Sequence, residues 1–73
     1  MNAQVYTKSG CIYCDKAKDL LEDMDIPYME FPIETYKTVY LDDPEAKASS
    51  PQIFLDGQHI GGYDDLRTHL LGV

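Results

Sequence analysis

The pattern that most constrains the fold lies in the first 33 residues of the chain. Residues 3–7, AQVYT, favour a short strand that ends at the turn Lys8-Ser9-Gly10. Four apolar residues then recur at helical spacing: Ala17, Leu20, Leu21 and Met24. They predict one buried face of an amphipathic helix that ends before Pro27, with Lys18 and the other charged residues on the solvent-exposed face.

A second strand is predicted directly after this helix. Residues 28–33 alternate between apolar and polar, so Met29, Phe31 and Ile33 are expected on one buried face. A strand, a helix and a second strand within about 30 residues form a βαβ unit. We therefore expect two parallel strands joined by a right-handed crossover.

The second half of the chain predicts a short helix and then a hairpin. Residues 34–50 are expected to form a helix or helix-loop, because Tyr36, Val39 and Tyr40 have helical spacing, and Asp43 before Pro44 favours one more turn. The strands expected at residues 53–55 and 58–60 flank Asp56-Gly57, a strong signal for a two-residue hairpin turn.

A last helix is predicted after Gly61-Gly62. Asp64 and Asp65 suit its N-terminus, the leucines Leu66, Leu70 and Leu71 would form its packing face, and Gly72 would end it. The resulting order is β-α-β-(short α)-β-β-α. This order predicts an α/β, thioredoxin-like fold with a four-stranded mixed sheet, in a single domain over residues 1–73.

Composition excludes several classes of function. A net charge of −7, from 13 acidic and 6 basic side chains, argues against binding to nucleic acid. No apolar run approaches the roughly 18 residues of a membrane span, and the N-terminus does not resemble a signal peptide. We therefore expect a protein without a membrane partner in the reducing cytoplasm.

The only two cysteines, Cys11 and Cys14, lie three residues apart in GCIYCDKAK. As a structural staple they would close a loop too short to constrain much of the unfolded chain. As zinc ligands they would need His59 and His69, which are ten residues apart and are expected at the surface. We therefore favour a redox pair, with no metal required.

The expected position of the cysteines makes them chemically unequal. Cys11 would stand at the N-terminus of the first helix, where free N–H groups and the helix dipole favour a thiolate, and Lys8 adds a nearby positive charge. Cys14 would lie one turn further along the helix and be less exposed. This arrangement suits a nucleophile, Cys11, and a resolving thiol, Cys14.

Three separated motifs resemble those of the glutaredoxin family. TKSGCIYC at residues 7–14 resembles the T-K-x-x-C-P-Y-C active site, SSPQIFLDGQHIGG at 49–62 resembles the family's T-V-P-Q-I-F stretch, and YDDL at 63–66 resembles its glutathione-binding segment. The resemblance covers nearly all of the chain. It implies a monomeric, glutathione-dependent oxidoreductase that reduces protein disulfides and protein–glutathione mixed disulfides, with ribonucleotide reductase a common partner in the family.

The resemblance also implies a glutathione site. Its residues are Lys8, Tyr13, Ser50, Pro51, Tyr63, Asp64 and Asp65. Lys8 would lie near the glycine carboxylate of glutathione, and Ser50, before a cis-proline, would pair with its cysteine moiety. The two aspartates and the backbone of Tyr63 would hold the γ-glutamyl end.

Ile12 departs from the family pattern, because it replaces the usual proline between the cysteines. In the family, such a change sometimes accompanies an iron–sulfur cluster. Two alternatives stand beside the main interpretation. One is a related redoxin that thioredoxin reductase reduces, and the other is a glutathione-ligated [2Fe–2S] carrier.

Overall fold

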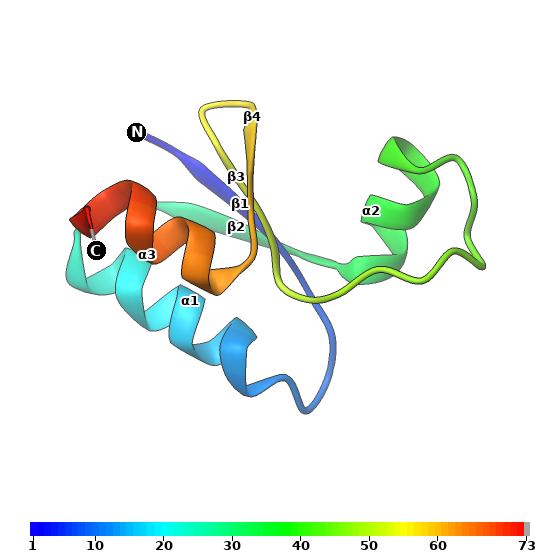
Figure 1. Ribbon diagram of the computed structural model, residues 1–73, viewed down its shortest axis with the longest axis horizontal. Helices are drawn as coiled ribbons and strands as arrows, with labels where there is room; N and C mark the ends of the chain where they lie inside the picture. Colours follow the sequence, from blue (N-terminus) through cyan, green and yellow to red (C-terminus); the bar gives the residue numbers. More distant parts are fainter. Residues whose placement is uncertain (73) are drawn as a thin grey trace.

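Seven elements follow one another in the predicted order (Figure 1). The computed structural model describes residues 1–72, so Val73, the end of the expected domain, lies outside the described residues. The elements are β1 (Ala3–Thr7), α1 (Ile12–Asp23), β2 (Tyr28–Pro32), α2 (Ile33–Tyr40), β3 (Gln52–Leu55), β4 (Gln58–Gly61) and α3 (Tyr63–Leu71). None of the helices in the described chain is long and apolar enough to cross a membrane.

The strands form one mixed sheet in the order β2-β1-β3-β4. β1 pairs with β2 in parallel, which confirms the predicted strand direction, and with β3 antiparallel. Val5 in the centre of β1 lies opposite Glu30 of β2 and Ile53 of β3. Partners in register point to the same side of a sheet, so these three side chains face the same layer.

The hairpin between β3 and β4 confirms the prediction made from Asp56-Gly57. Both residues have positive φ, 49° at Asp56 and 83° at Gly57. A two-residue turn of this kind matches the twist of the flanking strands and favours aspartate and glycine for that reason. The turn therefore sets the register of the sheet's C-terminal half.

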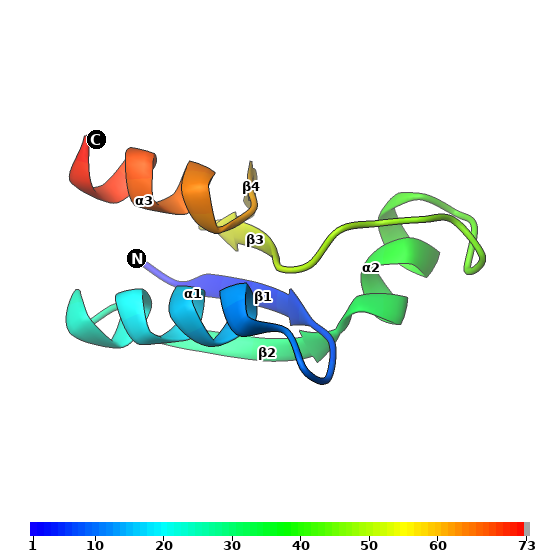
Figure 2. The ribbon, with the colours of Figure 1, turned by 60° about the horizontal axis from the view of Figure 1, so that its bottom comes forward.

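Helices α1 and α3 lie side by side on one face of the sheet, and α2 covers the end of the other face (Figure 2). The aliphatic core lies beneath α1 and α3. It consists of Ala3, Val5, Ala17, Leu21, Ile26, Ile53, Leu55 and Leu66. This layer fixes α1, and with it the cysteines, against the central strands.

The opposite face has an aromatic core instead. Tyr6, Ile33, Tyr36 and Phe54 are buried there, and Phe31 stacks on Tyr6 with ring centroids 5.2 Å apart. Burial, assisted by a hydrogen bond with Tyr40, raises the pKa of Tyr6 to about 12. The Tyr6 phenol therefore stays neutral in this layer at neutral pH.

Several predicted core positions are wrong. Met29 is 63% exposed because β2 is an edge strand and α2 covers only its C-terminal end. Ile33 is buried, but it begins α2 rather than ending β2. Met24 and Leu71 are exposed because each lies at the end of its helix, beyond the sheet it was expected to cover.

The segment between α2 and β3 contains a turn but no second helix. The Asp43 carbonyl accepts a hydrogen bond from the Ala46 N–H, and its carboxylate accepts one from the Glu45 N–H, at 3.1 and 3.0 Å. Asp43 thus closes the predicted turn. The chain then runs irregularly to Pro51, whose peptide bond with Ser50 is cis, as the resemblance implies.

Candidate active site

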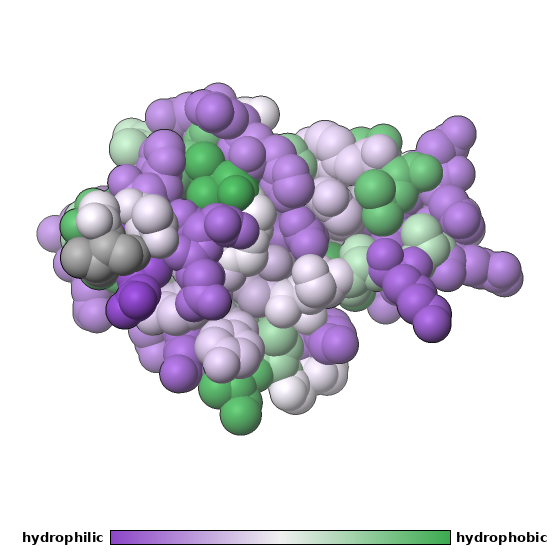
Figure 3. All heavy atoms as spheres, in the orientation of Figure 1, coloured by the Kyte–Doolittle hydropathy of each residue, from purple (hydrophilic) through white to green (hydrophobic). Residues whose placement is uncertain are grey.

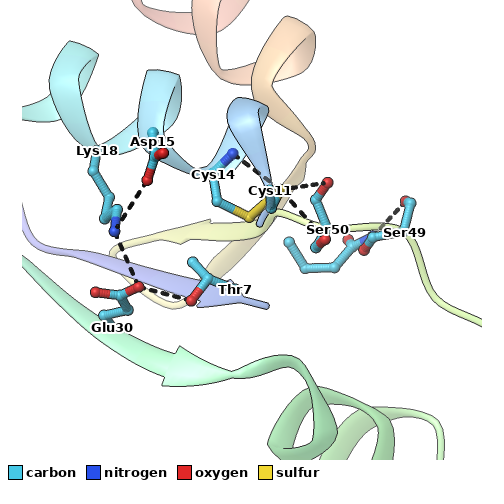
Figure 4. The surroundings of a disulfide bond; sticks show 9 residues. Thr7, Cys11, Cys14, Asp15, Lys18, Glu30, Ser49 and Ser50 are labelled. Carbon is cyan, nitrogen blue, oxygen red and sulfur yellow. Dashed lines mark hydrogen bonds and ion pairs between the residues drawn. A yellow bond between two sulfur atoms is a disulfide. The ribbon is translucent and has the colours of Figure 1, made fainter. Parts of the chain in front are cut away.

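The two cysteines lie at the start of α1 and form a disulfide (Figure 4). Their Cα atoms are 5.2 Å apart. Cys11 is the N-cap residue of α1 and is partly exposed, whereas Cys14 is only 2% exposed. The predicted inequality between an accessible and a buried sulfur is therefore confirmed in the positions of the two side chains.

The helix N-terminus acts directly on Cys11. Its Sγ accepts a hydrogen bond from the Cys14 N–H at 3.1 Å, in the position where a capping oxygen normally accepts one. In the reduced protein, the same N–H and the positive end of the helix dipole favour a thiolate on Cys11. No comparable group supports Cys14 from the helix backbone.

The loop before β3 borders Cys11 from the other side. The Ser50 carbonyl oxygen lies 3.5 Å from the Cys11 Sγ, and the Ser50 hydroxyl donates to the same sulfur at 3.5 Å. The side-chain amide of Gln52 donates to Ser49, and its oxygen lies 2.8 Å from Nε2 of His59. These bonds connect the loop to the hairpin, a role for His59 that sequence reasoning missed.

A groove of about 260 Å³ opens beside this loop. It is lined by Tyr13, Ser49, Ser50, Pro51, Gly62, Tyr63, Asp64 and Asp65. Six of the seven residues that the resemblance assigns to glutathione binding therefore surround one space. Three distant parts of the chain meet there, namely the start of α1, the cis-proline loop and the start of α3.

Aromatic side chains form one wall of the groove. The Tyr13 ring lies 6.0 Å from that of Tyr63, and Lys16 places its ammonium 5.2 Å from the Tyr13 centroid. Tyr13 is still 55% exposed. Its neighbour Ile12 is 69% exposed. Figure 3 shows hydrophobic surface over the region where α1 begins in the same orientation.

The two aspartates at the start of α3 have different roles in the fold. Asp65 accepts a hydrogen bond from the Gly62 N–H at 3.3 Å, so its carboxylate caps the helix. It also fills the space beside Gly61, whose φ is 124° and where an added Cβ would collide with the Asp65 carboxylate. Asp64 is exposed, and its carboxylate has no partner within residues 1–72.

Lys8, the seventh assigned residue, lies elsewhere. It lines a second cavity of about 600 Å³, on the other side of Cys11, together with both cysteines and part of β2. The structure thus separates Lys8 from the groove that contains the other six residues. Lys8 is exposed and has no partner in the described part of the chain.

A charged network that the sequence analysis missed borders this second cavity. Lys18 contacts Glu30 at 3.2 Å and Asp15 at 3.6 Å, and the Thr7 hydroxyl donates to Glu30 at 2.7 Å (Figure 4). The prediction that Lys18 belongs to the solvent-exposed face holds only in part, because its side chain lies against the sheet and is 23% exposed. The available signal was its spacing of four residues from Cys14.

The network shifts the protonation equilibria of its two main members. The hydrogen bond from Thr7, followed by that from Lys18, lowers the pKa of the Glu30 carboxyl. The hydrogen bond to Glu30 raises the pKa of Lys18. Both groups are therefore ionised over a wide range around neutral pH. Within residues 1–72, no group of three or more His, Cys, Asp or Glu side chains is placed to hold a metal ion.

Fold and site together define a class of protein. A Cys-x-x-Cys pair lies at the start of a helix and opposite a cis-proline, on a four-stranded sheet with three helices. These features define a thiol–disulfide oxidoreductase with a thioredoxin-like fold. The glutaredoxin family model matches residues 3–60, and the chain belongs to the glutaredoxin family. This confirms the resemblance seen in the motifs.

Known relatives agree with this assignment. Glutaredoxin 3 of Escherichia coli K12 is 42% identical over 67 residues, which cover 89% of this chain and 81% of the relative. The structure of reduced E. coli glutaredoxin matches with a TM-score of 0.72 and 34% identity, covering 96% of this chain and 93% of that one. Glutaredoxin 1 of Francisella tularensis, complexed with cacodylate, matches with a TM-score of 0.76 and 29% identity, covering 94% and 91%.

Proposed function

We propose that the protein uses glutathione to reduce protein disulfides and protein–glutathione mixed disulfides. The observation that carries this proposal is the groove that runs from Ser50, which contacts the Cys11 Sγ, to the N-terminus of α3. A small extended peptide with a sulfur near its middle matches such a site. Its thiol would reach Cys11, and its two ends would lie on either side.

Each part of glutathione has a matching group in this proposal. The γ-glutamyl carboxylate suits the free N–H groups at the start of α3, and the γ-glutamyl ammonium suits the Asp64 carboxylate. The cysteine moiety would pair with the backbone of Ser50, as an added strand does. Lys8 lies on the far side of Cys11, where its ammonium would attract the glycine carboxylate.

The proposed cycle assigns one step to each cysteine. The Cys11 thiolate attacks a substrate sulfur, a new disulfide forms, and the other substrate sulfur leaves as a thiol after it takes up a proton. Cys14 then attacks Cys11, and the intramolecular disulfide replaces the mixed one. Two glutathione molecules reduce this disulfide and become one molecule of oxidised glutathione, which a separate NADPH-dependent reductase recycles.

The proposal extends to the setting of the reaction. The protein acts as a monomer in the cytoplasm, its reaction requires no metal, and ribonucleotide reductase is among its disulfide partners. The use of the only cysteine pair for redox chemistry supports a reducing compartment, because secreted domains of this size use cysteines as structural staples.

Steady-state turnover tests the proposal. Purified protein is assayed with glutathione, glutathione reductase, NADPH and a small glutathione mixed disulfide. We expect NADPH oxidation that depends on both the protein and glutathione, and none with Cys11→Ser. Turnover with thioredoxin reductase but not with glutathione would show that glutathione is not the reductant. A coloured dimer that lacks thiol transfer after anaerobic purification would identify a [2Fe–2S] carrier instead.

A further inference from the structure

Lys18 lies on the same side of α1 as Cys14. The two residues are four positions apart, so their side chains are neighbours on the helix surface. Like Cys14, Lys18 points toward the sheet rather than the solvent, and only 23% of its side chain is exposed. Glu30 supplies a carboxylate 3.2 Å from its ammonium, and both groups line the cavity that Cys14 also borders.

The remaining partners hold Lys18 in place from the sheet. Glu30 faces α1, because it lies opposite Val5, a residue of the aliphatic core. Thr7, which donates to Glu30, is the last residue of β1 and is 8% exposed. The network thus connects β1, α1 and β2 at the point where the chain turns toward Cys11.

Cys14 needs a positive charge that the helix does not supply. A resolving thiol reacts as a thiolate, but burial disfavours the charged form, and Cys14 is almost fully buried. The backbone N–H of Cys14 already donates to the Cys11 Sγ. The groove on the cis-proline side contains Asp64 and Asp65 and does not include Cys14.

The second cavity contains the charges that face Cys14. Its charged residues are Lys8, Asp15, Lys18, Glu30 and Glu34. Lys8 belongs to the exposed loop, and Asp15 and Glu34 are exposed carboxylates. Lys18 is the one cation among them that is both partly buried and on the helix face of Cys14.

We propose that Lys18 is a positioning residue for the resolving step, in which its ammonium, held by Glu30, stabilises the Cys14 thiolate. This inference rests on the proposed function and deepens it. Cys14 loses its proton to solvent through the cavity, and its thiolate attacks the Cys11 Sγ. The Cys11–Cys14 bond forms, the bond from Cys11 to the substrate sulfur breaks, and the substrate leaves with the electron pair and takes up a proton.

The proposal predicts opposite effects for the two members of the ion pair. In a Cys11→Ser background, ultraviolet absorbance of the thiolate reports the pKa of Cys14 without any need for glutathione. Lys18→Met should raise this pKa by about one pH unit, and Glu30→Gln, which frees the ammonium from its countercharge, should lower it by about half a unit. A purely structural role would move it in the same direction in both variants, or not at all, and either result would overturn the proposal.

Two further variants serve as controls. Arg67→Met removes the same charge from an exposed position on α3 and should leave the Cys14 pKa unchanged. Lys18→Arg retains the charge and should restore most of the wild-type value even if it lowers the melting temperature. A Lys18→Arg protein that behaves like Lys18→Met would contradict an electrostatic role.

The rate of resolution gives an independent test. In the dithiol protein, release of thiol from a preformed mixed disulfide should be about threefold slower in Lys18→Met near neutral pH, because fewer thiolates form although each is the stronger nucleophile. The rate should recover as the pH rises above the new pKa. A rate loss that is the same at every pH would overturn the proposal, whether or not glutathione is the physiological reductant.

Discussion

The two sides of the disulfide differ in how their polar groups are used. On the cis-proline side, Asp64 and the first N–H groups of α3 border an open groove, and Asp64 has no internal partner in the described chain. On the other side, Lys18 and Thr7 both bond to the Glu30 carboxylate. Polar groups without a partner in the protein remain available to bind a ligand, whereas groups that already bond to one another keep neighbouring side chains and charges in fixed positions. The comparison therefore separates a binding side from a supporting side, whose charged residues, apart from Lys8, which has no partner within residues 1–72, mainly support the fold around Cys14.

The largest expected effect concerns the two sulfurs between these sides. Cys11→Ser should abolish all thiol transfer, because no nucleophile remains at the exposed position. Cys14→Ser should lose the reduction of protein disulfides and retain some removal of glutathione from glutathionylated proteins. Parallel assays with a disulfide substrate and a glutathione mixed disulfide measure the difference, and equal losses in both variants would contradict the unequal roles.

The next effect tests the binding side. Asp64→Asn removes the carboxylate proposed to pair with the γ-glutamyl ammonium, a charged hydrogen bond, and should raise the KM for glutathione about tenfold. Alkylation of Cys11 by iodoacetamide should continue at the wild-type rate. If alkylation slows and the KM stays constant, Asp64 does not belong to the binding site.

Asp65→Asn is the matched variant at the adjacent position. Asparagine keeps an oxygen that can accept the Gly62 N–H but removes the negative charge at the start of α3, so the free energy of unfolding should fall by about 0.5 kcal/mol. Its effect on the KM for glutathione should be smaller than that of Asp64→Asn. Chemical denaturation together with glutathione kinetics distinguishes the two aspartates, and a reversed order would exchange their roles.

A smaller effect tests the supporting side. Since Thr7 and Lys18 lower the pKa of Glu30 from its ordinary 4.5, the folded protein gains stability from the ionised carboxylate above that value and loses it as the pH falls through the lowered pKa. Glu30 is 45% exposed, so solvent screening limits this gain to about 1 kcal/mol or less. Melting temperatures between neutral and acidic pH should fall less steeply for Glu30→Gln than for the wild type.

The smallest effect is expected at Ile12, which stands between the two sides. Ile12 is the first residue of α1, where proline has no hydrogen bond to lose and restricts the unfolded chain. Ile12→Pro should therefore raise the free energy of unfolding by about 0.5 kcal/mol. A loss of stability on denaturation would indicate that the backbone at this position does not match proline.

The parts of the fold that depend on local signals could be predicted from the sequence. Asp56-Gly57 requires a specific turn, and Cys11 and Cys14 are three residues apart on a helix wherever the rest of the chain lies. Met29 could not be placed in this way, because alternation identifies two faces of a strand but not how far α2 extends over one of them. Ile33 is buried as expected, but alternation alone does not show that the strand ends at Pro32 and that Ile33 begins α2.

The site required information about residues far apart in the chain. Spacing could not bring Tyr13, Ser50 and Tyr63 together, and only the resemblance to a family did so. Neither the sequence pattern nor the family resemblance identified Lys18 as part of the site. Its partner Glu30 is defined by the register of β2 with β1, and a helical pattern alone does not reveal which charged residue at the edge of an apolar face lies against the sheet.

The contact between Gly61 and Asp65 limits which amino-acid substitutions this chain can accept during evolution. A side chain at residue 61 would have to occupy the volume that the Asp65 carboxylate fills, and at a φ of 124° it would also be strained. A substitution there would displace the helix cap, and the neighbouring groove would lose its shape. The last residue of the hairpin and the third residue of the final helix therefore cannot vary independently.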